Sequence, residues 1–361
     1  MRRRSDTFRP ALVTGVSGTL LFLLVGCVPP PPDPAPPIID HFATTATGFT
    51  DPALVPFTWT VHDPNGDTLT CRLDGDGDGT WDTTISPCPA TGGATATAGV
   101  GAHTATLQVS DAIFPAVTAT ESYTVGVGPT EPYNIDIQYV GATDSRVVDA
   151  VGRAVTKWSA VIARGVPDAE VHFAQGNCFG DLVPSYDGTV DDIVVDVTVM
   201  PLPGFMGDAS WCVVGSDGLP RLSMVRISTI GLDNLYTTGA LDDLVSHEFG
   251  HALGFGTVAP WATFTENTGE VTGYQFSGPR SVAEFLQLGG RGAAVPLSHD
   301  AGHWDETTLQ NELMTCYLEA GTTTHPLSGV TAAAMADLGY HVDMSAVDSW
   351  TVPPSPGYSS C

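Results

Sequence analysis

Residues 240–257, ALDDLVSHEFGHALGFGT, limit most strongly what this chain of 361 residues can fold into. Leucine and valine recur in the segment at helical spacing, and two aspartates stand where the positive N-terminal end of a helix would favour them. Gly254 is a favourable helix stop, because glycine readily adopts the left-handed conformation that ends many helices. On such a helix His247 and His251 lie four residues apart and project from one face, where their rings can share a metal ion.

The pattern H-E-x-x-H also predicts a catalytic role for these residues. His247 and His251 would bind zinc, and Glu248 would act as general base toward a water that zinc polarises together with the substrate carbonyl. The alternative is a helix with two surface histidines, but the helical context and the glycine stop favour the metal site. A catalytic zinc normally has three protein ligands and one position for water, so a third ligand is expected elsewhere in the chain.

The residues alone leave the third ligand open. Metzincin peptidases continue the motif as H-E-x-x-H-x-x-G-x-x-H, and this chain has Gly254 at the glycine position but Thr257 at the last histidine position. A gluzincin-type site would use a downstream glutamate instead. The downstream candidates are His299, His303, His325, Glu266, Glu270 and Glu284.

Residues 303–343, HWDETTLQNELMTCYLEAGTTTHPLSGVTAAAMADLGYHVD, resemble the C-terminal half of the leishmanolysin family. This family is a metzincin branch in which an insertion separates the glycine turn from the third histidine. The resemblance implies that His303, which precedes Trp304, is the third zinc ligand. It also implies that Met314 forms the methionine turn beneath the metal, and that residues 337–340 end the closing helix.

The resemblance extends roughly from residue 132 to residue 352 and is specific between residues 241 and 340. It implies a zinc endopeptidase acting on proteins or peptides. The insertion is compact for the family, and no cysteine-bearing pro-segment is recognisable. Residues 129–361 are therefore expected to form an α/β (α+β) metzincin-like domain. An opening strand, a helix over residues 145–163 and strands over 191–200 and 221–228 support a mixed layer.

Residues 38–128 have a different character. Short runs such as PFTWTV, DTLTCRL, HTATLQVS and ATESYTVGV alternate apolar with polar residues and are separated by Gly, Asp and Pro. This pattern is typical of a small antiparallel β-sandwich. The segment WTVHDPNGDTLTCRLDGDGDGTWD resembles bacterial immunoglobulin-like and PKD-type modules. The chain is thus expected to be multidomain, with the sandwich preceding the peptidase domain.

Alternate aspartates within this module suggest a second metal. Asp74, Asp76, Asp78 and Asp82 surround Gly79 and could wrap a structural Ca²⁺ in carboxylate oxygens. An EF-hand loop would end in glutamate at its twelfth position, where Ile85 stands. The competing interpretation is a hairpin turn rich in Asp and Gly.

The first residues predict export. Residues 1–27 combine four arginines with an apolar stretch and end in Leu-Val-Gly-Cys, which resembles a bacterial lipobox with Cys27 as the lipidated residue. An ordinary secretory signal with an incidental cysteine is the alternative. Residues 28–37 are mostly proline and predict a stiff spacer. The resemblance to bacterial lipoproteins implies, from Val28 after the cysteine, anchoring at the outer membrane or cell surface, with release from the cell as a further option.

Export also predicts disulfides. Six cysteines remain after Cys27, and in an oxidising compartment an even number indicates disulfide bonds. Pairing by proximity gives Cys71–Cys88, Cys178–Cys212 and Cys316–Cys361, among 15 arithmetically allowed connectivities.

The formal net charge of -27 excludes nucleic acid as a partner, because its phosphates are bound by Lys and Arg. The remaining partners are a protein or peptide substrate and a membrane reached through the lipid anchor. A surface adhesin carrying an inactive peptidase-like domain is the competing function. The intact residues His247, Glu248 and His251 argue against it.

Overall fold

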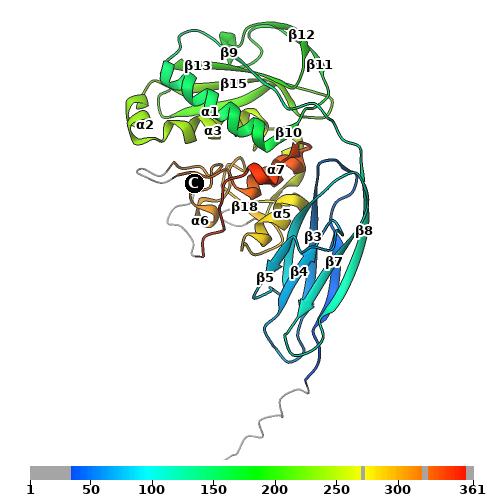
Figure 1. Ribbon diagram of the computed structural model, residues 1–361. Helices are drawn as coiled ribbons and strands as arrows, with labels where there is room; N and C mark the ends of the chain where they lie inside the picture. Colours follow the sequence, from blue (N-terminus) through cyan, green and yellow to red (C-terminus); the bar gives the residue numbers. More distant parts are fainter. Residues whose placement is uncertain (1–33, 270–272, 319–323, 355–361) are drawn as a thin grey trace, which may run out of the picture. The chain divides into compact units, whose positions relative to one another are not determined.

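The computed structural model describes residues 34–269, 273–318 and 324–354 (Figure 1). It shows a multidomain chain built mostly from β-sheets, with some helices. The predicted signal peptide, Cys27 and most of the spacer lie outside the described residues. In the part that is described, no helix is long and apolar enough to span a membrane.

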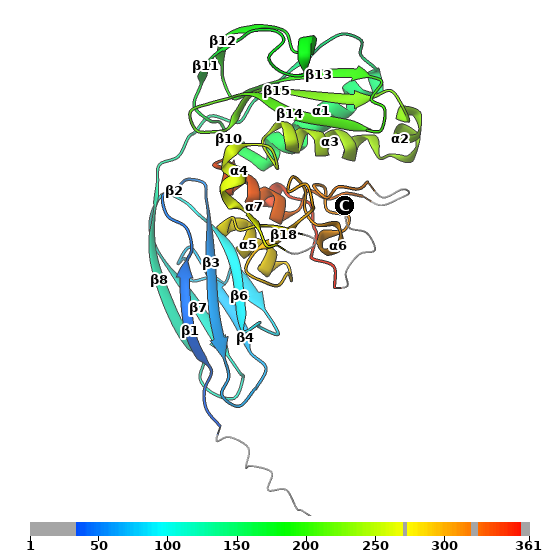
Figure 2. The same ribbon diagram turned by 180° about the vertical axis from the view of Figure 1, so that it is seen from behind.

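The N-terminal module contains two sheets that enclose one apolar core. The smaller sheet is antiparallel, with the order β1-β3-β6 (Figure 2). The larger has the order β2-β8-β7-β4-β5, in which only the β2–β8 pair is parallel. The strands are β1 (Ile38–Thr44), β2 (Phe49–Thr50), β3 (Ala53–His62), β4 (Thr70–Asp74), β5 (Thr83–Ile85), β6 (Thr91–Ala98), β7 (Gly101–Ser110) and β8 (Val117–Gly126).

Alternation along the strands produces this core. In β7 the residues Ala105, Leu107 and Val109 are buried while their neighbours are partly exposed, as expected when successive side chains point to opposite faces. They belong to one cluster with Phe57 and Trp59 of the facing sheet. The disulfide Cys71–Cys88 connects β4 to the segment before β6. A β-sandwich with this disulfide was predicted from the sequence.

The second part of the chain begins with a four-stranded sheet of order β14-β15-β13-β9. Strand β13 is parallel to β9 and β15, whereas β14 is antiparallel to β15 and ends the sheet. The elements of this region are β9 (Ile135–Tyr139), α1 (Ser145–Val161), β10 (Ile162–Arg164), β11 (Ala169–Phe173), η1 (Gly180–Leu182), β12 (Tyr186–Val190), β13 (Ile193–Met200), β14 (Gly207–Val214), β15 (Pro220–Ser228), α2 (Leu232–Thr238) and α3 (Leu241–Ala252).

Both faces of this sheet are covered, which explains the almost continuous apolar run of β13. Val195 and Val197 face a core shared with α1 and α3, including Trp158 and Phe249. Val194 faces the opposite way, toward the hairpin β11–β12. Figure 1 and Figure 2 show α1 and α3 running along the same face of the sheet. The disulfide Cys178–Cys212 joins the segment after β11 to β14. The third predicted pair involves Cys361, which lies outside the described residues.

The C-terminal region has shorter elements. They are α4 (Ala259–Phe264), β16 (Thr265–Asn267), β17 (Tyr274–Phe276), α5 (Pro279–Gln287), β18 (Val295–Leu297), α6 (Glu306–Leu309), α7 (Gly329–Leu338), β19 (His341–Val342) and η2 (Met344–Ala346). Strands β16, β17 and β18 form a small antiparallel sheet, and β19 pairs with β10. Helix α7 is buried along its whole length.

The helix expected over residues 145–163 corresponds to α1, and the strands expected over 191–200 and 221–228 correspond to β13 and β15. The edge strand β14 was not predicted from the sequence. Its residues are half-buried along the strand, so the apolar alternation that identifies other strands is weak in it.

Candidate metal centre

Helix α3 positions the three residues of the H-E-x-x-H motif. Asp242 and Asp243 stand in its first turn, and the helix ends at Ala252 with Gly254 in the left-handed region at φ 110°. His247, Glu248 and His251 are all buried. The helix therefore presents two imidazoles and a carboxyl group to the interior of the domain rather than to solvent.

His303 completes the cluster from a loop that follows β18. Its Nε2 lies 3.0 Å from Nε2 of His251, which in turn lies 3.1 Å from Nε2 of His247. The three rings form the one group of histidines among the described residues whose donor atoms converge as a metal site requires. The loop closely approaches the turn that follows α3, where a Cβ on Gly256 would lie 2.2 Å from the carbonyl oxygen of Gly302.

Hydrogen bonds on the outer side of the rings fix their tautomers. Nδ1 of His247 donates to the carbonyl of Leu313 at 2.7 Å, and Nδ1 of His251 donates to the carbonyl of Phe255 at 2.9 Å. A carbonyl oxygen can only accept, so each Nδ1 carries the proton and each Nε2 presents a lone pair. These two lone pairs face each other with no proton to share, an arrangement that a cation stabilises.

The third ring is oriented in the same way by a carboxylate. Nδ1 of His303 lies 2.8 Å from Oδ2 of Asp300. Oδ1 of Asp300 accepts from the hydroxyl of Ser298 and from the amide of Gly302. Burial tends to raise the pKa of Asp300, but the contacts with His303 and Ser298 outweigh it and hold that pKa below its usual value. Asp300 is thus an ionised acceptor that aims Nε2 of His303 inward.

The electrostatics keep the two rings of α3 neutral. Burial first, and then the proximity of the other histidines, lower the pKa of His247 well below its usual value. The same two causes lower the pKa of His251 to about 3. Neutral imidazoles retain the lone pairs that transition metals bind.

Glu248 occupies the wall of the same cavity. Burial is the main reason that its pKa is raised to about 8, with a smaller contribution from the charge of Asp208. Strand β14 brings Asp208 there, and a bidentate ion pair with Arg226 on β15 holds it. The neighbouring residue is Gly207, where a Cβ would lie 2.6 Å from Oε1 of Glu248. The cavity measures about 330 Å³ and includes all three histidines.

Met314 lies beneath the histidine helix. A Cβ on Gly250, which stands between the two histidines of α3, would lie 2.5 Å from Sδ of Met314. The amide of Trp304, next to His303, donates to the carbonyl of Met314 at 3.0 Å. Together with the bond from His247 to Leu313, these contacts tie the methionine turn to two of the three histidines.

Glu312 anchors this turn. It is fully buried, and its Oε1 accepts from the hydroxyls of Ser328 and Thr331 at the beginning of α7. Its Oε2 accepts from the amide of Met314 at 2.6 Å. Burial raises the pKa of Glu312 despite these donors. The role of Glu312 was not predicted from the sequence, because a lone glutamate gives no sign of such a network.

The other candidate ligands lie elsewhere. His299 is exposed, and Glu266 is exposed and accepts from Gln275. Glu284 is buried against Thr95 of the sandwich, whose hydroxyl donates to it at 2.6 Å. His325 lies beside Asp243 at 2.9 Å. Glu270 lies outside the described residues. Of the candidates that are described, only His303 joins the two histidines of α3.

Three of the four aspartates in the run at residues 74–82 of the sandwich lie close together. Carboxylate oxygens of Asp74, Asp76 and Asp78 lie within 4.8 Å of one another. However, both oxygens of Asp74 accept from backbone amides, those of Gly77 and Gly79. Asp82 does not join the group and accepts instead from the amide of Gly75. These are the hydrogen bonds of a turn, and the three gathered carboxylates could still hold a cation.

No known protein-family model matches the chain, and no curated protein is similar to it. Among solved structures, the PKD domain of an M14-like peptidase from Thermoplasmatales archaeon SCGC AB-540-F20 is similar to part of it. The match covers 26% of this chain and 99% of that domain, at 21% sequence identity and a TM-score of 0.23. A TM-score this low carries no argument. The site must be interpreted from its own geometry.

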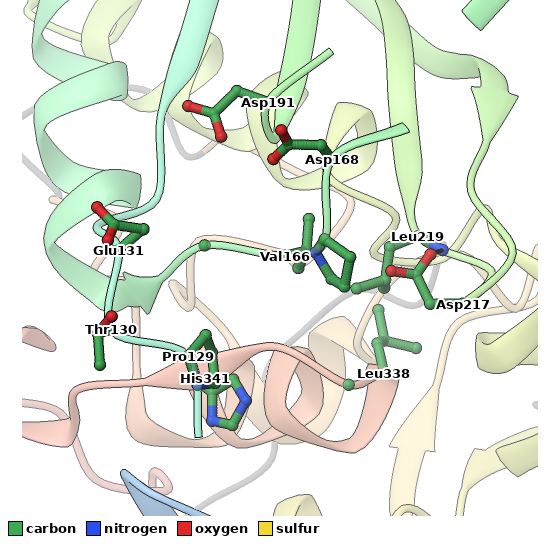
Figure 3. A pocket seen from close by; sticks show the side chains of 13 residues that line it. Pro129, Thr130, Glu131, Val166, Asp168, Asp191, Asp217, Leu219, Leu338 and His341 are labelled. Carbon is green, nitrogen blue, oxygen red and sulfur yellow. Dashed lines mark hydrogen bonds between the residues drawn. The ribbon is translucent and has the colours of Figure 1, made fainter. Parts of the chain in front are cut away.

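A second cavity, of about 510 Å³, lies away from the histidines (Figure 3). Acidic side chains line it, namely Glu131, Asp168, Asp191 and Asp217, together with Leu219, Leu338 and His341. It contains none of the residues of the histidine cavity. The convergent histidine donor atoms are in the smaller cavity.

Proposed function

We propose that this chain is a zinc-dependent endopeptidase whose metal is held by His247, His251 and His303. The observation that carries the proposal is the convergence of three Nε2 atoms in the cavity that Glu248 also lines, with those of His247 and His251 free of protons. Ligands around tetrahedral zinc, at bond lengths of about 2.0–2.1 Å, stand about 3.3 Å apart, so a spacing of 3.0–3.1 Å fits with slight expansion. Outer hydrogen bonds from each Nδ1 are also typical of zinc-binding histidines.

Zinc, when bound, supplies a Lewis acid that polarises water and the scissile carbonyl. The chain supplies the proton transfer. Glu248 lines the same cavity as the three histidines, and in its ionised form its carboxylate could act as the base. It would take a proton from the attacking water and pass it to the leaving amine.

A peptide substrate is favoured by the edge strand beside the site. Strand β14 has one neighbour in its sheet, and its first three residues line the histidine cavity. An extended peptide can add to such an edge through backbone hydrogen bonds, which recognise the chain without regard to most side chains. We infer that this edge binds the substrate across the metal.

The more specific assignment, a leishmanolysin-like metzincin, is also a proposal. It is supported by the left-handed Gly254 after the second histidine, by His303 before Trp304, and by Met314 beneath the helix. No family match accompanies these features. The site geometry supports a zinc peptidase in general, and the quoted motifs support the leishmanolysin branch in particular.

We further propose that the protein is exported and anchored at the bacterial outer membrane or cell surface through Cys27. The disulfides Cys71–Cys88 and Cys178–Cys212 support an oxidising compartment. Residues 1–33 carry the predicted signal and lie outside the described residues. Labelling with a radioactive fatty acid, with and without Cys27→Ser, tests the anchor.

The function is tested by casein cleavage with the zinc-loaded full chain. Glu248→Gln keeps the shape of the side chain but removes the base, and we expect it to lower kcat about 10²–10⁴-fold. The matched control is Glu266→Gln, an exposed glutamate outside the cavity, which should leave kcat within about twofold of the wild type. Retained cleavage in Glu248→Gln would contradict the mechanism. A zinc-loaded wild type that cleaves neither casein nor a mixed peptide library would favour a binding role.

A further inference from the structure

Three carboxylates from two loops meet at one end of the sandwich. Asp63 and Asp67 belong to the loop between β3 and β4, and Asp111 follows the last residue of β7. One oxygen of each lies within 4.8 Å of the others. These residues are distinct from the aspartate run at residues 74–82 and from the histidine cluster.

Two of these carboxylates have one oxygen engaged and one left over. Oδ1 of Asp63 accepts from the amides of Asn65 and Asp67, at 2.8 and 3.0 Å. Oδ1 of Asp111 accepts from the amides of Ile113 and Phe114, both at 2.9 Å. Oδ2 of Asp63 and Oδ2 of Asp111 are buried without a hydrogen-bond partner among the described residues. Turn formation explains the hydrogen bonds of the two Oδ1 atoms. It does not explain why the two Oδ2 atoms are buried without a partner.

The burial of Asp111 makes its unpartnered oxygen costly. The residue is only 6% exposed. Burial tends to raise the pKa of Asp111, but the amide donors outweigh it and the pKa is lowered, so the carboxylate is charged at neutral pH. A buried anionic oxygen without a donor or a counter-ion is strongly disfavoured. Among the described residues, none of the three aspartates forms a salt bridge with Lys or Arg. A cation between the carboxylates would remove the penalty.

We propose that Asp63, Asp67 and Asp111 bind a calcium ion. Calcium takes six to eight oxygen ligands at about 2.3–2.6 Å, so its opposite ligands stand about 4.8 Å apart, which the three oxygens can span. Its tolerance of irregular geometry suits ligands from two loops, whereas Mg²⁺ demands a near-ideal octahedron at about 2.0–2.1 Å. Backbone carbonyls and water would complete the shell.

The site would brace the end of the sandwich where β1 begins. The amide of Ala35 donates to Oδ1 of Asn65 at 3.0 Å, so the loop that carries Asp63 and Asp67 also holds the chain before β1. Calcium would tie this loop to the β7–β8 connection. The proposal does not depend on the peptidase function.

Calorimetric titration of the full chain with calcium chloride, after dialysis, tests the site. The wild type is expected to bind with a Kd of about 10⁻⁴–10⁻³ M, the range of extracellular calcium modules. Asp111→Asn should weaken this binding at least about tenfold, because it removes a buried charged ligand. The matched control is Asp76→Asn, in the aspartate run, which should leave the Kd within about twofold. An unchanged Kd in Asp111→Asn, or no calcium binding by the wild type, would overturn the proposal.

Hydrogen exchange of the wild type tests the location of the calcium site even if Asp111→Asn does not fold. Calcium is expected to slow amide exchange in peptides that cover residues 63–67 and 111–114. Slowing confined to residues 74–82 would instead assign the ion to the aspartate run and overturn the proposal. Equal slowing by the same concentration of Mg²⁺ would overturn the choice of calcium.

Discussion

At the residue scale, the side chains that orient the three histidines matter as much as the histidines themselves. Asp300 accepts from Nδ1 of His303, while backbone carbonyls perform the same task for His247 and His251. A carbonyl cannot be removed by substitution, so Asp300 is the one orienting group that mutation can test directly.

We expect Asp300→Asn to weaken zinc binding about 10–100-fold, the usual effect of losing a partner of a histidine ligand. An asparagine can still accept through its oxygen, but it provides no charge to strengthen the basicity of the ring. Competition with a chromogenic zinc chelator measures the affinity. The control is His299→Ala, because His299 is exposed and stands one residue before Asp300. Equal affinities in Asp300→Asn and the wild type would show that Asp300 does not orient a ligand.

The buried carboxyl group of Asp196 on β13 predicts that the stability of the fold depends on pH. It is 1% exposed, its Oδ1 has no partner among the described residues, and burial raises its pKa to about 6. A raised pKa means that the folded state holds the proton more tightly than the unfolded state. This contribution to stability is complete below pH 3.8 and is lost as the pH rises through about 6.

We therefore expect the free energy of unfolding of the wild type to fall, relative to that of Asp196→Asn, by about 2 kcal/mol between pH 4 and pH 7. The value follows from about 1.4 kcal/mol per pKa unit, reduced for solvent screening. Urea unfolding at several pH values measures it. Parallel stability curves for the two proteins would show that Asp196 keeps an ordinary pKa.

At the element scale, the loop after α3 and the loop that carries His303 depend on close backbone contact. Gly256 has φ 71°, and its missing Cβ makes room for the carbonyl of Gly302. We expect Gly256→Ala to lower the free energy of unfolding by about 2–3 kcal/mol and to weaken zinc binding, because the loop that carries His303 must move away.

The control is Gly289→Ala, at φ 99° with no atom within 4 Å of the added Cβ. This substitution adds backbone strain but no steric clash. It should lower the free energy of unfolding by about 1 kcal/mol without changing the zinc affinity. Urea unfolding and zinc competition measure both proteins. If the two variants behave alike, the contact with Gly302 does not position His303.

Sequence patterns predicted the elements that carry strong local signals. Helix α3 was predicted from its periodicity and Gly254, and β13 from its apolar run. His303 lies 52 residues after His251, and no local pattern connects them. Its place came from a family resemblance. The roles of Asp300, Glu312 and Gly207 depend on contacts between distant segments, which periodicity and composition cannot reveal.

At the scale of the whole molecule, the sandwich contacts the second part of the chain through α5. The amide of Thr95 donates to the side chain of Gln287 at 2.9 Å, and Nε of Arg280 donates to the carbonyl of Leu54 at 2.9 Å. Burial raises the pKa of Glu284 in this interface, and Leu54 packs into the core of the second part. The sequence predicted a separate sandwich module before the peptidase domain. These contacts argue for testing activity on the full chain.

The zinc content of the full chain tests the central claim most directly. After removal of metal and equilibration with zinc, the wild type and His299→Ala should each retain one tightly bound zinc per chain, measured by atomic absorption after gel filtration. His303→Ala should lose it, because two imidazoles bind zinc far more weakly than three. A wild type without zinc, or a His303→Ala variant that retains it as firmly as His299→Ala, would contradict the assignment of this centre.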